Sequence, residues 1–139
     1  RFKVFIGDSR KSLSEYLGQY YENNTPAEKY SEMKHKKTLQ KPLQSACVIA
    51  ICMKRDPKES VPEEEEIAAV AMAVQNMWLS CTAYEIGCYW SSPKSMYNAA
   101  DFLGLEEGER CLGMLYMGYH TGIELQGKRQ SIAEKVQWM

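Results

Sequence analysis

Hydrophobic and polar residues alternate over residues 1–8, and this pattern gives way to helical spacing after Asp8. The alternation predicts a β-strand. Over residues 9–21 the apolar positions recur every three or four residues, which predicts a helix. These positions are Leu13, Tyr16, Leu17, Tyr20 and Tyr21. A strand followed by a helix is a typical start of a layered α/β or α+β domain.

The next segment, residues 23–42, is polar and rich in lysine, and Pro26 and Pro42 are expected to interrupt its structure. We interpret it as a partly helical surface segment with a solvated face, or alternatively as a lid over a site. Residues 45–53 then form a short, continuous apolar run that contains β-branched residues. Such a run predicts a strand that is covered on both faces.

The longest apolar segment, residues 62–86, predicts a helix with apolar residues on nearly every side. Ser60 and Glu63 have the spacing of a capping box, and the acidic residues 63–66 suit the positive end of the helix dipole. Gly87 is expected to end the helix. A helix of this kind must be covered on all sides. We expect a second subunit to provide part of the cover, and the alternative is a helix wrapped entirely by its own domain.

The remaining pattern predicts an extended segment over residues 88–91, a helix over residues 93–103 and a strand over residues 110–119. We expect Ser92 to cap the start of this helix and Gly104 to cap its end. Strands that are separated by helices, in a chain of 139 residues, predict a single domain over residues 1–139.

Composition narrows the choice of partners. The net charge of -1 provides no overall field that would attract nucleic acid or an anionic membrane. Polar Gln75 and Asn76 interrupt the apolar helix, so no membrane span is predicted. The five cysteines form no C-x-x-C pair and lie mostly in apolar segments, so we expect reduced core thiols in a cytoplasmic protein rather than disulfides or a metal site.

Familiar catalytic motifs are missing from the sequence. It contains no G-x-S-x-G elbow, no phosphate-binding G-x-x-x-x-G-K loop and no H-E-x-x-H pair. If the protein is an enzyme, a bound cofactor is therefore expected to carry out the chemistry, and no catalytic side chain is assigned. Ser92-Pro93 opens a predicted helix whose first amides could bind a ligand, and Lys128-Arg129 could bind a phosphate. The simpler alternatives are an ordinary helix cap and a solvated basic pair.

Three stretches carry a resemblance to a known family. They are "EEEIAAVAMAVQNMWLSCTAYEIGCYWSSP", "FLGLEEGERCLGMLYMGY" and "KRQSIAEKVQW". Their content and order resemble the nitroreductase family of FMN-dependent oxidoreductases. The resemblance implies an α+β fold with a central antiparallel sheet flanked by helices. It also implies an intertwined homodimer built around the long buried helix, with FMN at the subunit interface.

The resemblance implies roles for particular residues. The segment Tyr89, Trp90, Ser91 and Ser92 is expected to lie against the flavin ring, with main-chain amides near its reactive nitrogen. Arg129, with Lys128 beside it, is expected to hold the FMN phosphate.

The activity that the resemblance implies is a ping-pong reaction. NAD(P)H reduces the flavin, and a nitroaromatic, a quinone or a similar small acceptor then takes the electrons. An alternative is a non-catalytic dimeric module of the same fold that binds a ligand or partner and has lost its flavin site. A third interpretation is a narrower flavin reaction, such as reductive dehalogenation or ring fragmentation.

One feature of the family is missing from the sequence. Members of the family begin with a helical segment that bears an Arg-Arg-Ser type motif and contacts the FMN phosphate, whereas this sequence starts after that segment. We therefore expect either further residues before Arg1 or a protein without a complete flavin site.

Overall fold

The computed structural model of the protein describes residues 1–122, 127 and 129–139. Four strands, β1 (Phe2–Phe5), β2 (Cys47–Lys54), β3 (Gly87–Ser91) and β4 (Glu109–Gly118), form one sheet. The strand order is β1-β2-β4-β3, and every neighbouring pair is antiparallel. The predicted central antiparallel sheet is therefore confirmed.

Strand β2 lies in the interior of the sheet and is buried on both faces, as its continuous apolar run predicts. Val48 and Ala50 belong to the core on one face, and Ile49 and Ile51 belong to the core on the other. Successive side chains of a strand point to opposite faces, so a strand covered by two layers needs apolar residues at every position.

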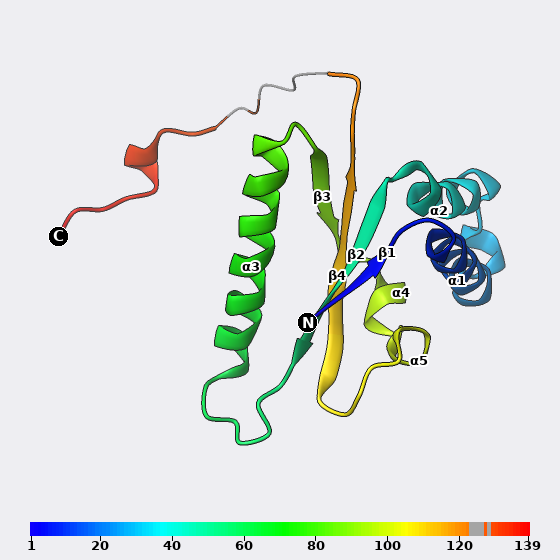
Figure 1. Cartoon of the computed structure of the whole chain (residues 1–139), viewed down its shortest axis with the longest axis horizontal. Coiled ribbons are helices and arrows are strands. Elements are labelled where there is room, and N and C mark those ends of the chain that lie inside the picture. Colours follow the sequence, from blue (N-terminus) through cyan, green and yellow to red (C-terminus); the bar gives the residue numbers. More distant parts are fainter. Residues whose placement is uncertain (123–126, 128) are drawn as a thin grey trace.

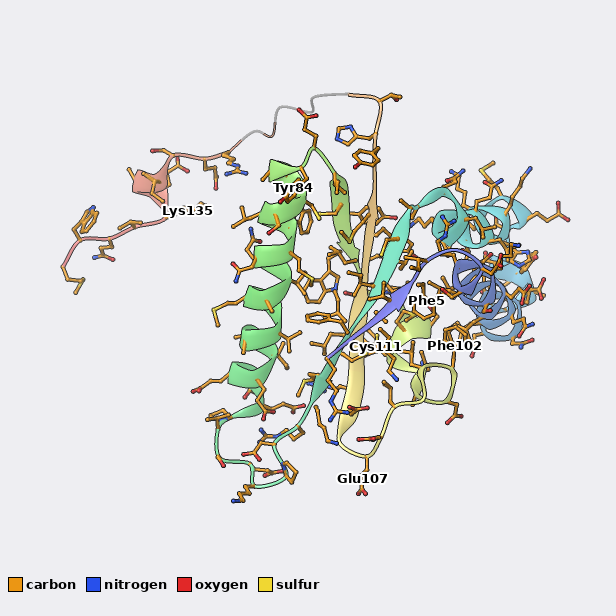
Figure 2. The ribbon with its side chains drawn as sticks, viewed as in Figure 1. Phe5, Tyr84, Phe102, Glu107, Cys111 and Lys135 are labelled. Atoms are coloured by element: carbon orange, nitrogen blue, oxygen red, sulfur yellow. The ribbon has the colours of Figure 1, made fainter. Side chains whose placement is uncertain are left out.

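One face of the sheet is covered by four helices, α1 (Ser9–Asn24), α2 (Glu32–Gln44), α4 (Lys94–Tyr97) and α5 (Ala100–Leu103), as Figure 1 shows. A short 3-10 turn, η1 (Ala27–Lys29), connects α1 to α2. Buried residues from α1, α4 and α5 form the core on this side. The ring of Phe102 stacks on Tyr16 at 4.3 Å and on Phe5 at 5.9 Å between centroids, and Phe5 and Phe102 lie side by side in Figure 2.

The other face is covered by one long helix, α3 (Glu63–Ala83) (Figure 1). Its inner side packs Val70, Val74 and Trp78 against the sheet. Its outer side is open in the single chain, where Met72 is 63% exposed and Leu79 is 59% exposed. The single chain thus leaves apolar surface of the helix uncovered, as its all-round apolar composition leads us to expect.

Three sequence expectations about helix ends are wrong. Pro42 does not interrupt α2 but lies inside it with its ring buried, near the C-terminal end, where a proline removes one backbone hydrogen bond. Ser60 makes no cap for α3, whose N-cap residue is Pro62. Gly87 is not the cap at the C-terminal end of α3, because Glu85 adopts a left-handed conformation (φ 56°) there and Gly87 begins β3.

The helix predicted over residues 93–103 is divided into α4 and α5. Ser92 does not cap α4, because its hydroxyl is engaged by Trp90 and by the carbonyl of Leu112. Gly104 does end α5 in a left-handed conformation, with φ 55°, as predicted.

Two further expectations concern the state of the cysteines and the presence of a membrane span. Cys47, Cys52, Cys81, Cys88 and Cys111 are all free thiols. Within the described ranges, each helix falls short of the length or the apolar character that crossing a membrane requires.

Candidate functional site

The candidate site is built on β3 and on the turn that follows it, because the predicted flavin-contacting residues Tyr89, Trp90, Ser91 and Ser92 are consecutive there. Among the described residues, strand β3 is an edge strand that pairs with β4 alone. Alternate N–H and C=O groups of an edge strand point away from the sheet. The segment therefore presents main-chain donors and acceptors in a row at an open edge.

Tyr89 lies on the side of the sheet that α1, α2 and α4 cover. Its ring stacks on that of Tyr116, the residue directly opposite on β4, with centroids 5.1 Å apart and planes 13° apart. Burial raises the pKa of Tyr89 and that of Tyr116, so both phenols stay neutral at physiological pH. Tyr89 is still 43% exposed and provides a flat aromatic surface.

A cation lies beside this surface. The ammonium of Lys41 is 5.8 Å from the centroid of the Tyr89 ring, within range of a cation–π interaction. Helix α2 carries this lysine to the site, because α2 ends directly before β2. Lys41 is a candidate site residue that sequence reasoning missed.

Trp90 points to the opposite face and packs with the core under α3. Its indole Nε1 donates to Oγ of Ser92 at 2.8 Å, and the Ser92 hydroxyl donates to the carbonyl of Leu112 at 3.2 Å. The pairing register skips Leu112, since Ile51 pairs with Gly113 and Cys52 with Cys111. This bulge leaves the Leu112 carbonyl available to hold Ser92 in place.

Gly113 fits tightly beneath the same turn. A Cβ atom on Gly113 would lie 2.5 Å from Nε1 of Trp90, 2.7 Å from the carbonyl oxygen of Ser91 and 2.9 Å from Oγ of Ser92. Its φ of +143° is also one that residues with side chains rarely adopt. The turn at residues 90–92 is therefore held against the backbone of β4.

A cleft of about 340 Å³ opens at the other end of β3. Tyr89 and Tyr116 form its aromatic side, and Gln44, Tyr119 and His120 also line it. His120 lies so close to Gly87 that a Cβ there would be 2.7 Å from its Cδ2 atom. The cleft is large enough to accommodate part of a planar ligand lying along the strand.

The thiol of Cys88 is not suited to nucleophilic catalysis. Burial, with the neighbouring Cys81 thiol, raises the pKa of Cys88 to about 12. A thiol reacts as its thiolate, which is scarce at this pKa. In the described part of the chain, no cluster of three or more His, Cys, Asp or Glu residues could hold a metal ion.

The predicted phosphate-binding residues lie apart from this segment. Arg129 is exposed in the C-terminal tail, which includes the 3-10 turn η2 (Ile132–Glu134). Within residues 129–139, the hydrogen bonds are all local to the tail. Lys128 lies outside the described residues. The structure thus brings Tyr89, Trp90, Ser91 and Ser92 together and does not bring Arg129 to them within one chain.

Comparisons with known proteins identify the family. Residues 1–119 match the nitroreductase family. The chain belongs to this family, so the resemblance carried by the sequence is confirmed. The comparison with curated protein sequences gives no match.

Solved structures share the fold. A nitroreductase-like family protein from Bacillus cereus is 26% identical, with a TM-score of 0.78 over 100% of this chain and 72% of that chain. The FMN-dependent nitroreductase NfnB from Mycobacterium smegmatis, solved with NADPH, is 14% identical, with a TM-score of 0.73 over 100% of this chain and 78% of that chain.

A third solved structure is an iodotyrosine deiodinase bound to FMN and 3-iodo-L-tyrosine. It is 16% identical, with a TM-score of 0.61 over 94% of this chain and 72% of that chain. These likenesses confirm a nitroreductase-like α+β fold.

Proposed function

We propose that the protein is an FMN-dependent NAD(P)H oxidoreductase that reduces nitroaromatics, quinones or similar small acceptors. The observation that carries the proposal is the edge segment Tyr89–Ser92 in a chain that belongs to the nitroreductase family. The M. smegmatis relative, named for its dependence on FMN and solved with NADPH, supports the same cofactor and donor. The chemistry that FMN would supply at this segment is hydride transfer from NAD(P)H and electron transfer to the acceptor.

The donor set of the site fits a flavin ring. A flavin presents a row of ring nitrogens and carbonyl oxygens along one edge, and the open edge of β3 presents a matching row of main-chain groups. The bulge at Leu112 and the close contact at Gly113 keep residues 90–92 in position. Preorganised donors of this kind tune a bound cofactor without rearrangement.

Lys41 would provide positive charge beside a flavin bound at this segment. Its ammonium lies beside Tyr89, and in the described part of the chain it forms no ion pair. An unneutralised cation next to a cofactor stabilises negative charge that develops on it. We propose that Lys41 has this electrostatic role and that Tyr89 and Trp90 provide flat and bulky packing beside the ring.

The phosphate contact is proposed to come from Lys128 and Arg129 in a homodimer. The open outer side of α3 favours association with a second copy. In such a dimer the tail of one chain can reach the site of the other. Arg129 offers a forked guanidinium that suits a phosphate.

We further propose that residues 1–139 form a single nitroreductase-like domain and that the protein is cytoplasmic. The family match over residues 1–119 supports the first proposal. The five free thiols support the second, because reduced cysteines persist in the cytosol.

The proposal is tested by the flavin half-reactions. The purified full chain, loaded with FMN and freed of excess by gel filtration, should be yellow. NADH or NADPH should bleach the colour in the absence of air, and a nitroaromatic or a quinone should restore it. A protein that retains FMN but is bleached by neither donor would contradict the proposed activity. A protein that retains no FMN would favour the non-catalytic module.

A further inference from the structure

A second depression adjoins the Tyr89–Ser92 segment on the side of α1. It consists of a hollow of about 90 Å³ that reaches Ser91 and a hollow of about 190 Å³ that reaches Tyr20. Both hollows are lined by Leu17, Thr38, Pro93 and Ser95, so they adjoin each other. We name this continuous depression, from Ser91 to Tyr20, the α1–α4 groove.

The size of the α1–α4 groove limits its occupant. Pockets for drug-sized ligands measure roughly 300–1000 Å³. The two hollows are smaller, at about 90 Å³ and about 190 Å³, and suit a molecule with one ring rather than a dinucleotide. The floor is apolar, with Leu17 only 4% exposed, and Tyr20 and Tyr21 form an aromatic wall. A flat aromatic molecule therefore fits the groove.

The polar groups at the outer end favour negative charge. The Tyr20 hydroxyl accepts a hydrogen bond from Nδ2 of Asn98 at 2.9 Å. In the described structure its own proton has no acceptor, so it can be donated to a ligand. Lys94 lines the same hollow, and among the described residues no carboxylate lines either part of the groove. One neutral donor and one cation together suit an anionic oxygen.

We infer that the α1–α4 groove is the acceptor subsite and that it selects a single-ring aromatic acceptor with an anionic oxygen substituent, such as a carboxylate. The ring of the acceptor lies toward Ser91, and its anionic group lies between Tyr20 and Lys94. This inference rests on the proposed function, because Ser91 belongs to the segment proposed to contact the flavin. The proposed function names nitroaromatics and quinones in general, and this inference narrows the acceptor to single-ring aromatics that carry an anionic oxygen.

The test compares a charged probe with a neutral one. 4-Nitrobenzoate and nitrobenzene are titrated into the FMN-loaded full chain, and binding is followed by saturation-transfer NMR. The native protein should bind 4-nitrobenzoate more tightly. Lys94→Met should weaken binding of 4-nitrobenzoate about tenfold, the effect of losing one hydrogen bond to a charged group, and leave nitrobenzene unchanged. Tyr20→Phe should also weaken binding of the carboxylate.

Two matched variants serve as controls. Lys36→Met removes a lysine from the exposed face of α2, and Tyr97→Phe removes a hydroxyl from an exposed residue of α4; neither residue lines the groove. Both should leave the binding of both probes unchanged. The inference is overturned if Lys94→Met and Lys36→Met bind 4-nitrobenzoate equally well.

Failure of the proposed function can be distinguished from failure of the groove inference. The rate at which NAD(P)H bleaches the flavin in the native protein tests the proposed function, and the control variant Lys36→Met should be bleached at the same rate. A chain that holds no flavin contradicts the proposed function. The NMR titration is then run on the full chain without FMN and still tests the groove. Selective loss of 4-nitrobenzoate binding in Lys94→Met supports the groove, and equal binding in the two lysine variants overturns it.

Discussion

Gly113 is the residue on which the geometry of the candidate site most depends. The turn at residues 90–92 closes directly over it, and three atoms of that turn lie within 3 Å of where a Cβ would be. Backbone atoms and a ring nitrogen held by a hydrogen bond cannot move aside cheaply. The contact therefore links the stability of β4 to the position of the proposed flavin segment.

Gly113→Ala should destabilise the protein by about 2 kcal/mol, because overpacking and an unfavourable φ act together. Urea denaturation followed by fluorescence measures the change. Gly122→Ala is the matched control, since no atom lies within 4 Å of the position of its Cβ. Equal stability of the two variants would show that the turn does not pack on Gly113 as described.

Arg129→Ala should reduce the amount of FMN that the purified protein retains, because the proposed charge-assisted contact to the phosphate would be lost. Retention is measured from the ratio of flavin to protein absorbance after gel filtration. Lys135→Ala, which removes another exposed cation of the tail, should retain as much FMN as the native protein. If Arg129→Ala also retains it, the phosphate contact has been assigned to the wrong residue.

The site could be predicted from the sequence only where its residues are neighbours in the chain. Tyr89, Trp90, Ser91 and Ser92 are consecutive, so the resemblance identifies them together. Lys41 could not be found in this way, because it is separated from Tyr89 by strand β2 and helix α3. Its position depends on the packing of α2 against the sheet, which a lysine-rich surface pattern does not reveal.

At the scale of elements, the loop between β2 and α3 is organised by Glu66. Its carboxylate pairs with Arg55 at 2.8 Å and accepts the backbone N–H of Asp56 at 2.8 Å. These contacts lower the pKa of Glu66 below its ordinary value of 4.5, the ion pair with Arg55 first and the Asp56 amide second. The loop is thereby fixed to the first turns of α3.

Glu66 should give the protein a measurable sensitivity to acid. Its pKa is lower in the folded protein than in the unfolded chain, so its contribution to stability is present above pH 4.5 and is lost as the pH falls through the folded value. Glu66→Gln should lower stability at neutral pH, and the difference should shrink in acid. Glu64→Gln is the control. The free energy of unfolding is measured from denaturation curves at several pH values. A constant difference across pH would contradict this role.

Most elements follow from local patterns, and the errors come from tertiary contacts that local patterns do not show. The alternation at residues 1–8 and the apolar run at residues 45–53 correspond to β1 and β2. Pro42 is tolerated in the last turn of α2 because the ring is buried, which residue preferences alone do not show. Gly87 is needed for the close approach of His120 rather than for a helix cap.

At the scale of the molecule, apolar surface lies open on the α3 side of the sheet. The outer face of α3 exposes Met72 and Leu79, and the edge strand β1 exposes Phe2 and Val4. Phe2 and Val4 pair with Ile51 and Ile49, so they lie on the face that α3 covers elsewhere. Surfaces of this kind mark sites of association. The sheet order that exposes them depends on long-range pairing and could not be predicted from local patterns.

Met72→Glu should dissociate the proposed dimer, because it places a charge in the centre of an apolar contact. The fold of each chain should survive, since Met72 is 63% exposed in the single chain. Met33→Glu makes the same change at a residue of α2 that is 68% exposed and should leave the association unchanged. Light scattering with circular dichroism measures both properties. If Met72→Glu forms a dimer of the native size, α3 does not lie in the interface.

Sedimentation velocity of the FMN-loaded full chain, recorded at the protein band and at the visible flavin band together, tests the central claim most directly. We expect both signals to move in a single boundary with the mass of a dimer. A protein boundary without visible absorbance, with the flavin left behind in solution, would contradict the claim that this chain is a flavin-dependent oxidoreductase.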